Sequence, residues 1–124
     1  MEQPLPETAT ALVALSDGIV TVRIRAGARQ SLADAQGNLS ASLEERGGQR
    51  RPLLIDIREA VPLDADVRRY YSGEVLLGFT ALALLINASP LGRMIGNVYL
   101  RVANTGIPTR LFTEEDVARE WLRT

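Results

Sequence analysis

The segment that most constrains the fold is residues 52–58, an apolar run that closes on charge (Pro-Leu-Leu-Ile-Asp-Ile-Arg). Its side chains do not alternate between apolar and polar, so a strand formed here must bury both of its faces. Such a strand needs packed layers on both sides, which is typical of parallel sheets in α/β domains. The run therefore predicts a central strand, with Asp56 near its carboxyl end.

A β-hairpin is expected before this strand. Residues 10–15 are short and apolar, and the Ser-Asp-Gly sequence at residues 16–18 is a turn signal. Residues 19–25 then alternate with a period of two, placing Val20, Val22 and Ile24 on one face and Thr21, Arg23 and Arg25 on the other. Two strands around Asp-Gly predict a half-buried hairpin.

A helix is expected between the hairpin and the central strand. Ser31 and Asp34 form a capping-box pattern, since the serine oxygen can accept from a free helix N–H and the acid can reach back. The Gly47-Gly48 pair ends the helix, because glycine adopts the left-handed cap without steric cost. We expect a helix over residues 32–46, with a right-handed crossover that makes the flanking strands parallel.

The next two elements are less regular. Asp64 is placed to cap a helix whose inner face carries Val67, Tyr71 and Val75. The residues that follow are rich in alanine and leucine, which favours a helix by propensity. Their place in an alternating order of strands and helices favours a buried strand, and we expect one over residues 80–87.

A third helix is expected to start at Ser89-Pro90, because serine is a favoured N-cap and proline lacks an N–H that the first turn leaves unbonded. It should end near Ala103. Its predicted apolar face consists of Leu91, Met94, Ile95, Val98 and Val102. A second, polar face carries Arg93, Asn97 and Arg101 at intervals of four residues.

The chain is expected to close with a strand and a helix. Residues 108–112 predict a short strand, at a sheet edge because of the proline. Thr113 is expected to cap the last helix, with Asp116 in the capping-box position. That helix should dock through Val117, Ala118, Trp121 and Leu122.

The predicted order is thus β-β-α-β-α-β-α-β-α, an α/β fold with a single mixed β-sheet and packed helices. We expect one domain over residues 10–124, preceded by a flexible tail at residues 1–9, which holds two prolines and little apolar material.

Composition narrows the chemistry that this domain could perform. The 124 residues include no Cys, His or Lys, and all 14 basic residues are Arg. Without Cys and His there are no disulfides, no thiol catalysis and none of the usual zinc sites. The lack of His removes the commonest general base, and the lack of Lys removes Schiff-base chemistry and the phosphate-binding lysine. We expect no catalytic residue, no metal site and no cofactor.

Charge and hydropathy bear on partners and location. The net charge of −1 gives no electrostatic reason to bind DNA or RNA. The longest apolar stretch, residues 75–86, is shorter than the about 20 residues of a membrane span. The first ten residues carry two Glu and no Arg, which is the wrong sign for a signal peptide. We expect a cytoplasmic protein without a transmembrane segment or a nucleic-acid partner.

The predicted order and several segments resemble the STAS-like domains, a fold shared with bacterial anti-sigma-factor antagonists. The likeness is closer to the branch of bacterial proteins called STAS/SEC14-like or SpoIIAA-like. It covers roughly residues 12–122, and its most specific segment is the short strand and capped helix that end in Trp121-Leu122. The other segments that carry it are residues 52–58, 81–86 and 89–97. The resemblance implies a strand at residues 81–86.

The resemblance also implies a place for a regulatory switch. In STAS antagonists a Ser or Thr near the start of the helix after the third strand is phosphorylated by a partner kinase, and the added charge changes binding. Residues 58–66 of this chain contain no hydroxyl, and Ser72 lies too deep in the predicted helix. The phospho-acceptor is therefore not expected here. Asp64 or Asp66 could imitate a permanent charge, or Asp64 could simply cap the helix.

Eight residues are candidates for a binding site. Asp56 and Arg58 close the central strand, and ligands of open α/β sheets bind outside the carboxyl ends of strands. Arg93, Asn97 and Arg101, on the polar face of the third predicted helix, could bind an anion, because guanidinium groups bind oxyanions in pairs, or they could simply face solvent. Tyr70 and Tyr71 diverge by about 100° on a helix, so one of them is expected at a surface. The full set is Asp56, Arg58, Asp64, Arg68, Tyr70, Arg93, Asn97 and Arg101.

Three functions follow. The leading hypothesis is a non-enzymatic STAS-like regulatory or protein-interaction module that forms a homodimer or binds another protein. The alternative is a SEC14-like domain that binds a small apolar or anionic ligand, in an apolar pocket between sheet and helices with Arg93 or Arg101 at its mouth. The third is an enzyme whose catalytic carboxylates are Asp56, Glu59 or Asp64. The structural alternative is that Asp56 pairs with a nearby Arg and that Glu59 is solvated.

Overall fold

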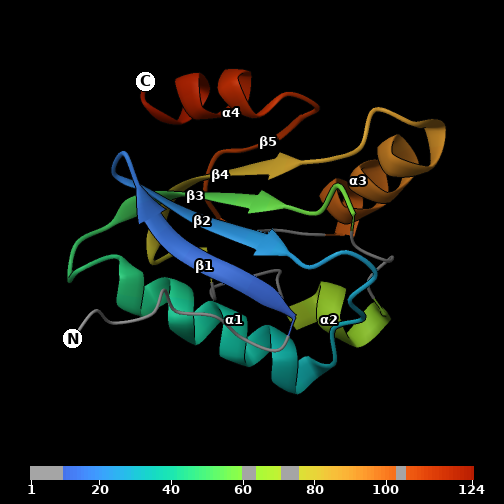
Figure 1. The fold of residues 1–124 in the computed structure, drawn as a ribbon, viewed down its shortest axis with the longest axis horizontal. Helices are drawn as coiled ribbons and strands as arrows, with labels where there is room; N and C mark the ends of the chain where they lie inside the picture. The colour runs from blue at the N-terminus through green and yellow to red at the C-terminus, as the bar shows by residue number, and fades with distance from the viewer. Residues whose placement is uncertain (1–9, 60–63, 71–75, 103–105) are drawn as a thin grey trace.

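The computed structural model describes residues 10–59, 64–70, 76–102 and 106–124 (Figure 1). Five strands form one sheet in the order β1-β2-β3-β4-β5, and four helices pack on it. The strands are β1 (Ala11–Ser16), β2 (Ile19–Ile24), β3 (Arg51–Asp56), β4 (Phe79–Leu85) and β5 (Thr109–Phe112). The helices are α1 (Leu32–Glu45), α2 (Ala65–Tyr70), α3 (Pro90–Val102) and α4 (Glu115–Leu122). The predicted order and the single mixed sheet are confirmed.

The sheet mixes one antiparallel pair with three parallel pairs. β1 and β2 form the predicted hairpin, in which Asp17 and Gly18 both have positive φ (54° and 76°). Two such residues give the tight turn that matches the twist of the strands. β2 pairs in parallel with β3, β3 with β4, and β4 with β5. The carboxyl ends of β2 to β5 therefore meet at one edge of the sheet.

The strand order explains where the helices lie. The sheet order follows the chain order without a reversal, so each right-handed crossover steps in the same direction. As a result α1, α2 and α3 lie on one face, and α4 alone returns across the other (Figure 1). A sheet of this order has no topological switch point, which is where ligands of open α/β sheets usually bind.

β3 is buried on both faces, as its sequence predicts. Leu53 joins the core under α1 and α2, and Leu54 joins the core under α4. β4 divides in the same way, because Leu84 faces the first core and Leu85 faces the second. Burial on two faces thus explains why the sequences of β3 and β4 are continuous apolar runs without alternation.

The helix starts test the capping predictions. Ser31 and Asp34 form the predicted capping box, with the Ser31 hydroxyl accepting from the Asp34 N–H at 3.1 Å. The Ser89 hydroxyl accepts from the N–H of Gly92 at 3.1 Å, as expected for an N-cap. The prediction that Thr113 caps the last helix is wrong. α4 begins one residue later, after Glu114, whose side chain makes no cap bond.

The predicted apolar face of α3 is also wrong in part. Leu91 and Met94 are 58% and 56% exposed. The helix instead turns Gly92 and Gly96 toward the sheet, and both are buried. A Cβ at Gly96 would lie 3.1 Å from side-chain atoms of Ile86 and Leu111, so the helix backbone packs close to the strands. The glycines decide the orientation of α3, because they permit an approach that larger residues would block.

Some predictions concern residues outside those described. They are the flexible tail at residues 1–9, the inward positions of Tyr71 and Val75, and the end of α3 near Ala103. The side chains of Ile95, Val98 and Val102 are likewise not described.

Candidate functional site

Four of the eight candidate residues lie at the edge of the sheet where the parallel strands end, in two groups. Asp56 and Arg58 lie at the end of β3, on the face that α4 covers. Arg93 and Asn97 lie on α3, at a cleft beside the end of β5. The two groups are bonded very differently, and the difference bears on what each can do.

The first group is a network of ion pairs around Asp56. The Oδ2 atom of Asp56 accepts from Arg23 Nη1 and from Arg58 Nη2, both at 2.8 Å. The Oδ1 atom accepts from the backbone N–H and the Nε of Arg58, both at 3.0 Å. The sequence places Arg23 on the outward face of β2, across the register from Asp56. Both oxygens of the carboxylate are thus occupied by charged or backbone donors.

Helix α4 extends the same network. Glu115 accepts from Arg23 Nη2 at 2.7 Å and from Arg119 Nε at 2.9 Å, and it lies 3.5 Å from Arg58 Nη2. Arg119 Nη2 donates to the hydroxyl of Thr21 on β2 at 3.0 Å. The network therefore binds the last helix to the second and third strands through residues far apart in the chain. We name it the edge network: Arg23, Asp56, Arg58, Glu115 and Arg119.

The carboxylates of the edge network are held in the ionised state. Burial would raise the pKa of Asp56, but hydrogen bonds from Arg58 and Arg23 outweigh it and hold that pKa below its usual value. The hydrogen bond from Arg23 is the largest cause that lowers the pKa of Glu115 to about 2, with Arg119 acting in the same direction. A general acid or base works best with a pKa near the operating pH. Neither carboxylate has one.

A hollow of about 590 Å³ opens beside the edge network. Arg25, Glu59 and Asn87 line it together with Arg23 and Arg58. Its charged groups are of both signs, and its arginines from the edge network are already bonded to carboxylates.

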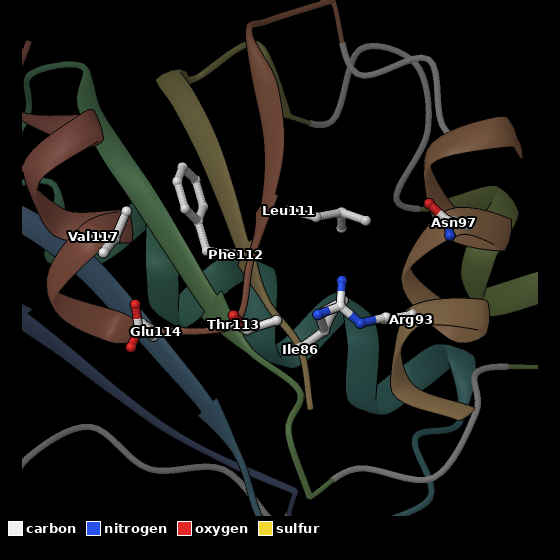
Figure 2. A pocket seen from close by; sticks show the side chains of 8 residues that line it. All are labelled: Ile86, Arg93, Asn97, Leu111, Phe112, Thr113, Glu114 and Val117. Carbon is white, nitrogen blue, oxygen red and sulfur yellow. The ribbon is translucent and has the colours of Figure 1, made fainter. Parts of the chain in front are cut away.

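The second group lines a cleft of about 290 Å³ between α3 and the end of β5 (Figure 2). Ile86 and Leu111 form an apolar floor, and Arg93 and Asn97 project from α3. Thr113 lies at the end of β5, opposite Arg93. An apolar surface with a few convergent polar groups is the usual composition of a small-molecule site.

The polar groups of the cleft have few bonds within the described part of the chain. Arg93 Nε donates to the carbonyl of Ala88 at 3.3 Å, which orients the guanidinium, and no carboxylate of the described residues pairs with it. Neither the Asn97 amide nor the Thr113 hydroxyl bonds to another described residue. The cleft therefore presents uncommitted hydrogen-bond donors.

The remaining candidate residues lie elsewhere. Asp64 precedes α2, and its Oδ1 accepts from Arg29 Nη2 at 2.9 Å on the surface. Tyr70 is half-buried against the core under α1 and α2. Arg68 lies in α2 and Arg101 in α3, and the side chains of both are outside the described atoms. The structure thus brings four of the eight candidates to the sheet edge, in two pairs.

Sequence reasoning missed three members of the edge network. The period-two pattern places Arg23 only on the polar face of a strand, and Glu115 and Arg119 are not among the eight candidate residues. A signal was present, because Glu115 and Arg119 are four residues apart on the last helix and can pair there. Nothing in the spacing shows that this pair also meets Arg23, which is 92 residues away in the chain.

The described residues show two further features of the site. No three carboxylates among them gather as metal ligands would. No helix among them is long and apolar enough to span a membrane.

The fold is that of an α/β domain of SpoIIAA-like architecture. Among solved structures, the chain is similar to a protein of the DUF3478 family with a SpoIIAA-like fold from Shewanella loihica PV-4, with 13% sequence identity and a TM-score of 0.56. That match covers 96% of this chain and 99% of the other. A protein of unknown function from Arthrobacter sp. FB24 is 30% identical, over 89% of this chain and 90% of the other, with a TM-score of 0.35.

The family itself is defined by sequence. Residues 13–124 match the family described as "Domain of unknown function (DUF7793)", and the chain belongs to that family. No curated protein matches the sequence. The expected resemblance to SpoIIAA-like domains is confirmed at the level of the fold.

Proposed function

We propose that the protein is a non-enzymatic, cytoplasmic interaction module of the STAS-like type. The observation that carries this proposal is the bonding of the edge network. The carboxylates that could serve a catalyst at the strand ends, Asp56 and Glu115, are held ionised by three arginines. A carboxylate bound in this way stabilises the structure. It has no proton to donate near pH 7, and its low pKa makes it a weak general base. Recognition is then the function left to the edge of the sheet.

The module is proposed to work without a phospho-acceptor at the start of α2. Residues 58–66 contain no Ser or Thr, so a kinase has no hydroxyl to modify there. Asp64 lies at the corresponding point, and its carboxylate already pairs with Arg29. Binding would therefore be controlled by the concentration of a partner or ligand and not by added charge at this position.

The proposed protein partner is a second copy of this chain, bound through the outer side of α3. Leu91 and Met94 lie one turn apart on that helix, and each is more than half exposed. Exposed apolar side chains grouped on one helix are typical of an interaction surface. Burial of both residues against the same helix of a second copy would give a symmetric dimer, which is the commonest form of oligomer.

Sedimentation analysis tests this proposal. We expect the wild-type protein to sediment as a dimer and the Leu91→Gln/Met94→Gln variant as a monomer. Leu15→Gln is the matched control, because Leu15 is a similarly apolar residue that is 40% exposed on β1. A wild-type monomer at all concentrations would remove the dimer. Turnover of chromogenic ester or phosphate substrates that Asp56→Asn abolishes would contradict the non-enzymatic assignment.

The cleft between α3 and β5 favours a second candidate function, the binding of a small ligand. An apolar floor with Arg93 above it has the composition that a site for a small anionic ligand requires. This candidate is compatible with the first, because the ligand and the partner would use different sides of α3.

A further inference from the structure

We infer that the cleft between α3 and β5 binds a small monocarboxylic acid, with its carboxylate on Arg93 and its apolar chain on Ile86 and Leu111. The inference deepens the second candidate function by naming the class of ligand. It rests on three observations: the uncommitted donors, the apolar floor and the position of one acidic residue.

The donors define the charge of the ligand. Arg93 projects its guanidinium into the cleft, and the carbonyl of Ala88 bonds only to its Nε, so within the described part of the chain both terminal nitrogens are open to a ligand. A guanidinium binds a carboxylate through two parallel hydrogen bonds, a geometry that a neutral group cannot reproduce. Asn97 lies one helical turn further on and can add an amide N–H. Among the described residues of the cleft, two of the three uncommitted side-chain donors, Arg93 and Asn97, therefore lie on α3, and Thr113 is the third.

The floor defines the body of the ligand. Leu111 is directed toward α3 in Figure 2, and Ile86 lies beneath Arg93. Gly96 holds the helix close to these two side chains, because a Cβ at that position would already meet both. The polar row of α3 is thereby kept beside an apolar surface. A ligand with a short hydrocarbon chain removes that surface from water.

Glu114 limits the ligand to one negative charge. Its side chain lines the cleft from the α4 side, across the end of β5 from Arg93 (Figure 2). A second carboxylate at the far end of the ligand would approach Glu114 without a second arginine among the described cleft residues to neutralise it. A phosphate monoester, which carries nearly two charges at pH 7, meets the same difficulty. The charge pattern thus favours a monocarboxylate.

Titrations followed by NMR with the ¹⁵N-labelled full chain test the inference with three six-carbon probes. Hexanoate has the proposed charge and chain, hexan-1-ol lacks the charge, and adipate adds a second carboxylate at the far end. We expect hexanoate to shift the signals of Asn97, Leu111 and Thr113 and to bind about tenfold or more tightly than either of the others.

Four variants separate the roles of the charged groups. Arg93→Gln should weaken hexanoate binding about 10- to 100-fold, and Arg93→Lys should restore part of it, since the charge returns without the paired geometry. Glu114→Gln should improve adipate binding and leave hexanoate nearly unchanged. Arg123→Gln is the control, because Arg123 is an exposed arginine that pairs with Asp17 at the opposite end of the sheet.

Three results would overturn the inference: equal binding of hexanoate and hexan-1-ol, retained binding in Arg93→Gln, or shifts that map away from the cleft. None of them would affect the proposed dimer, since sedimentation of the Leu91→Gln/Met94→Gln variant tests that separately. Conversely, a monomer that binds hexanoate at Arg93 would support the ligand and reject the dimer.

Discussion

The edge network and the cleft lie at the same edge of the same sheet, yet their arginines are in opposite situations. In the edge network, Arg23 and Arg58 each bond to Asp56 and also face Glu115. In the cleft, Arg93 bonds to one backbone carbonyl and to no carboxylate of the described residues. The comparison teaches that charge alone does not mark a binding site. The bonding of the charge separates an arginine that holds the fold from one that is open to a ligand.

The largest expected effect comes from breaking the edge network at Glu115. The Glu115→Gln variant should lose about 2–3 kcal/mol of unfolding free energy, because two arginines lose a charged acceptor at a side chain that is only 24% exposed. Urea unfolding measures the loss. Arg119 is the most affected partner, since its side chain is 12% exposed and its Nη1 already has no partner among the described residues.

Glu120→Gln is the matched control for that variant. Glu120 lies in the same helix and is exposed, so the change should stay within about 0.5 kcal/mol. Equal losses in the two variants would show that the edge network does not stabilise the fold, and the comparison with the cleft would then fail.

A pair of glycines gives the next effect and tests the cleft side of the comparison. A Cβ at Gly92 would overlap the backbone carbonyl of Asn87, so Gly92→Ala should cost about 1–3 kcal/mol and displace Arg93. Gly37 in α1 has open space around it, and Gly37→Ala should add about 0.5–1 kcal/mol of stability. Thermal unfolding of both variants checks the opposite signs. A stabilised Gly92→Ala would mean that α3 does not pack as closely as described.

Acid should weaken the edge network by a smaller amount. The folded pKa of Glu115 is about 2, below its ordinary value of 4.5, so its contribution is complete above pH 4.5 and is lost as the pH falls toward 2. With solvent screening, the loss should be about 1–2 kcal/mol. No side-chain type in this chain has an ordinary pKa between 5 and 8, because the chain contains no His. Its stability should therefore change little over that pH range.

Urea midpoints at pH 7, 4.5 and 2.5 measure this dependence. The Glu115→Gln variant should lose less stability than the wild type between pH 4.5 and 2.5, because it has no carboxylate to protonate at that position. Parallel decreases in the two proteins would assign the acid sensitivity to other carboxylates. Asp56 acts in the same direction, since its pKa is also lowered, so part of the decrease should remain.

Most of the fold could be predicted from the sequence because its elements depend on local patterns. The alternation in residues 19–25, the apolar run at 52–58 and the Ser31 capping box each encode a strand or a helix within a few residues. The parallel pairing of the two strands that flank the first helix then followed from the right-handed crossover between them. These signals need no knowledge of which distant residues meet.

The parts that could not be predicted depend on contacts between distant segments. Arg23 meets Glu115 only because α4 returns across the face opposite to the other helices. The orientation of α3 depends on how closely it approaches Ile86 and Leu111. The positions of its apolar residues, taken alone, predict that the wrong face of the helix packs on the sheet. Helix periodicity identifies an apolar face but does not decide whether a glycine face packs more closely.

The smallest expected effect on stability is that of Arg93→Gln. This variant tests most directly the comparison between the cleft arginine and the arginines of the edge network. Its guanidinium makes one backbone bond among the described residues, so unfolding free energy should change by no more than about 0.5 kcal/mol. Arg58→Gln removes two charged hydrogen bonds to Asp56 and an ion pair with Glu115, and it should cost about 1–3 kcal/mol. If denaturation shows the two variants to be equally destabilised, Arg93 is a structural residue. If only Arg58→Gln is destabilised, the arginine of the cleft is free to serve a ligand.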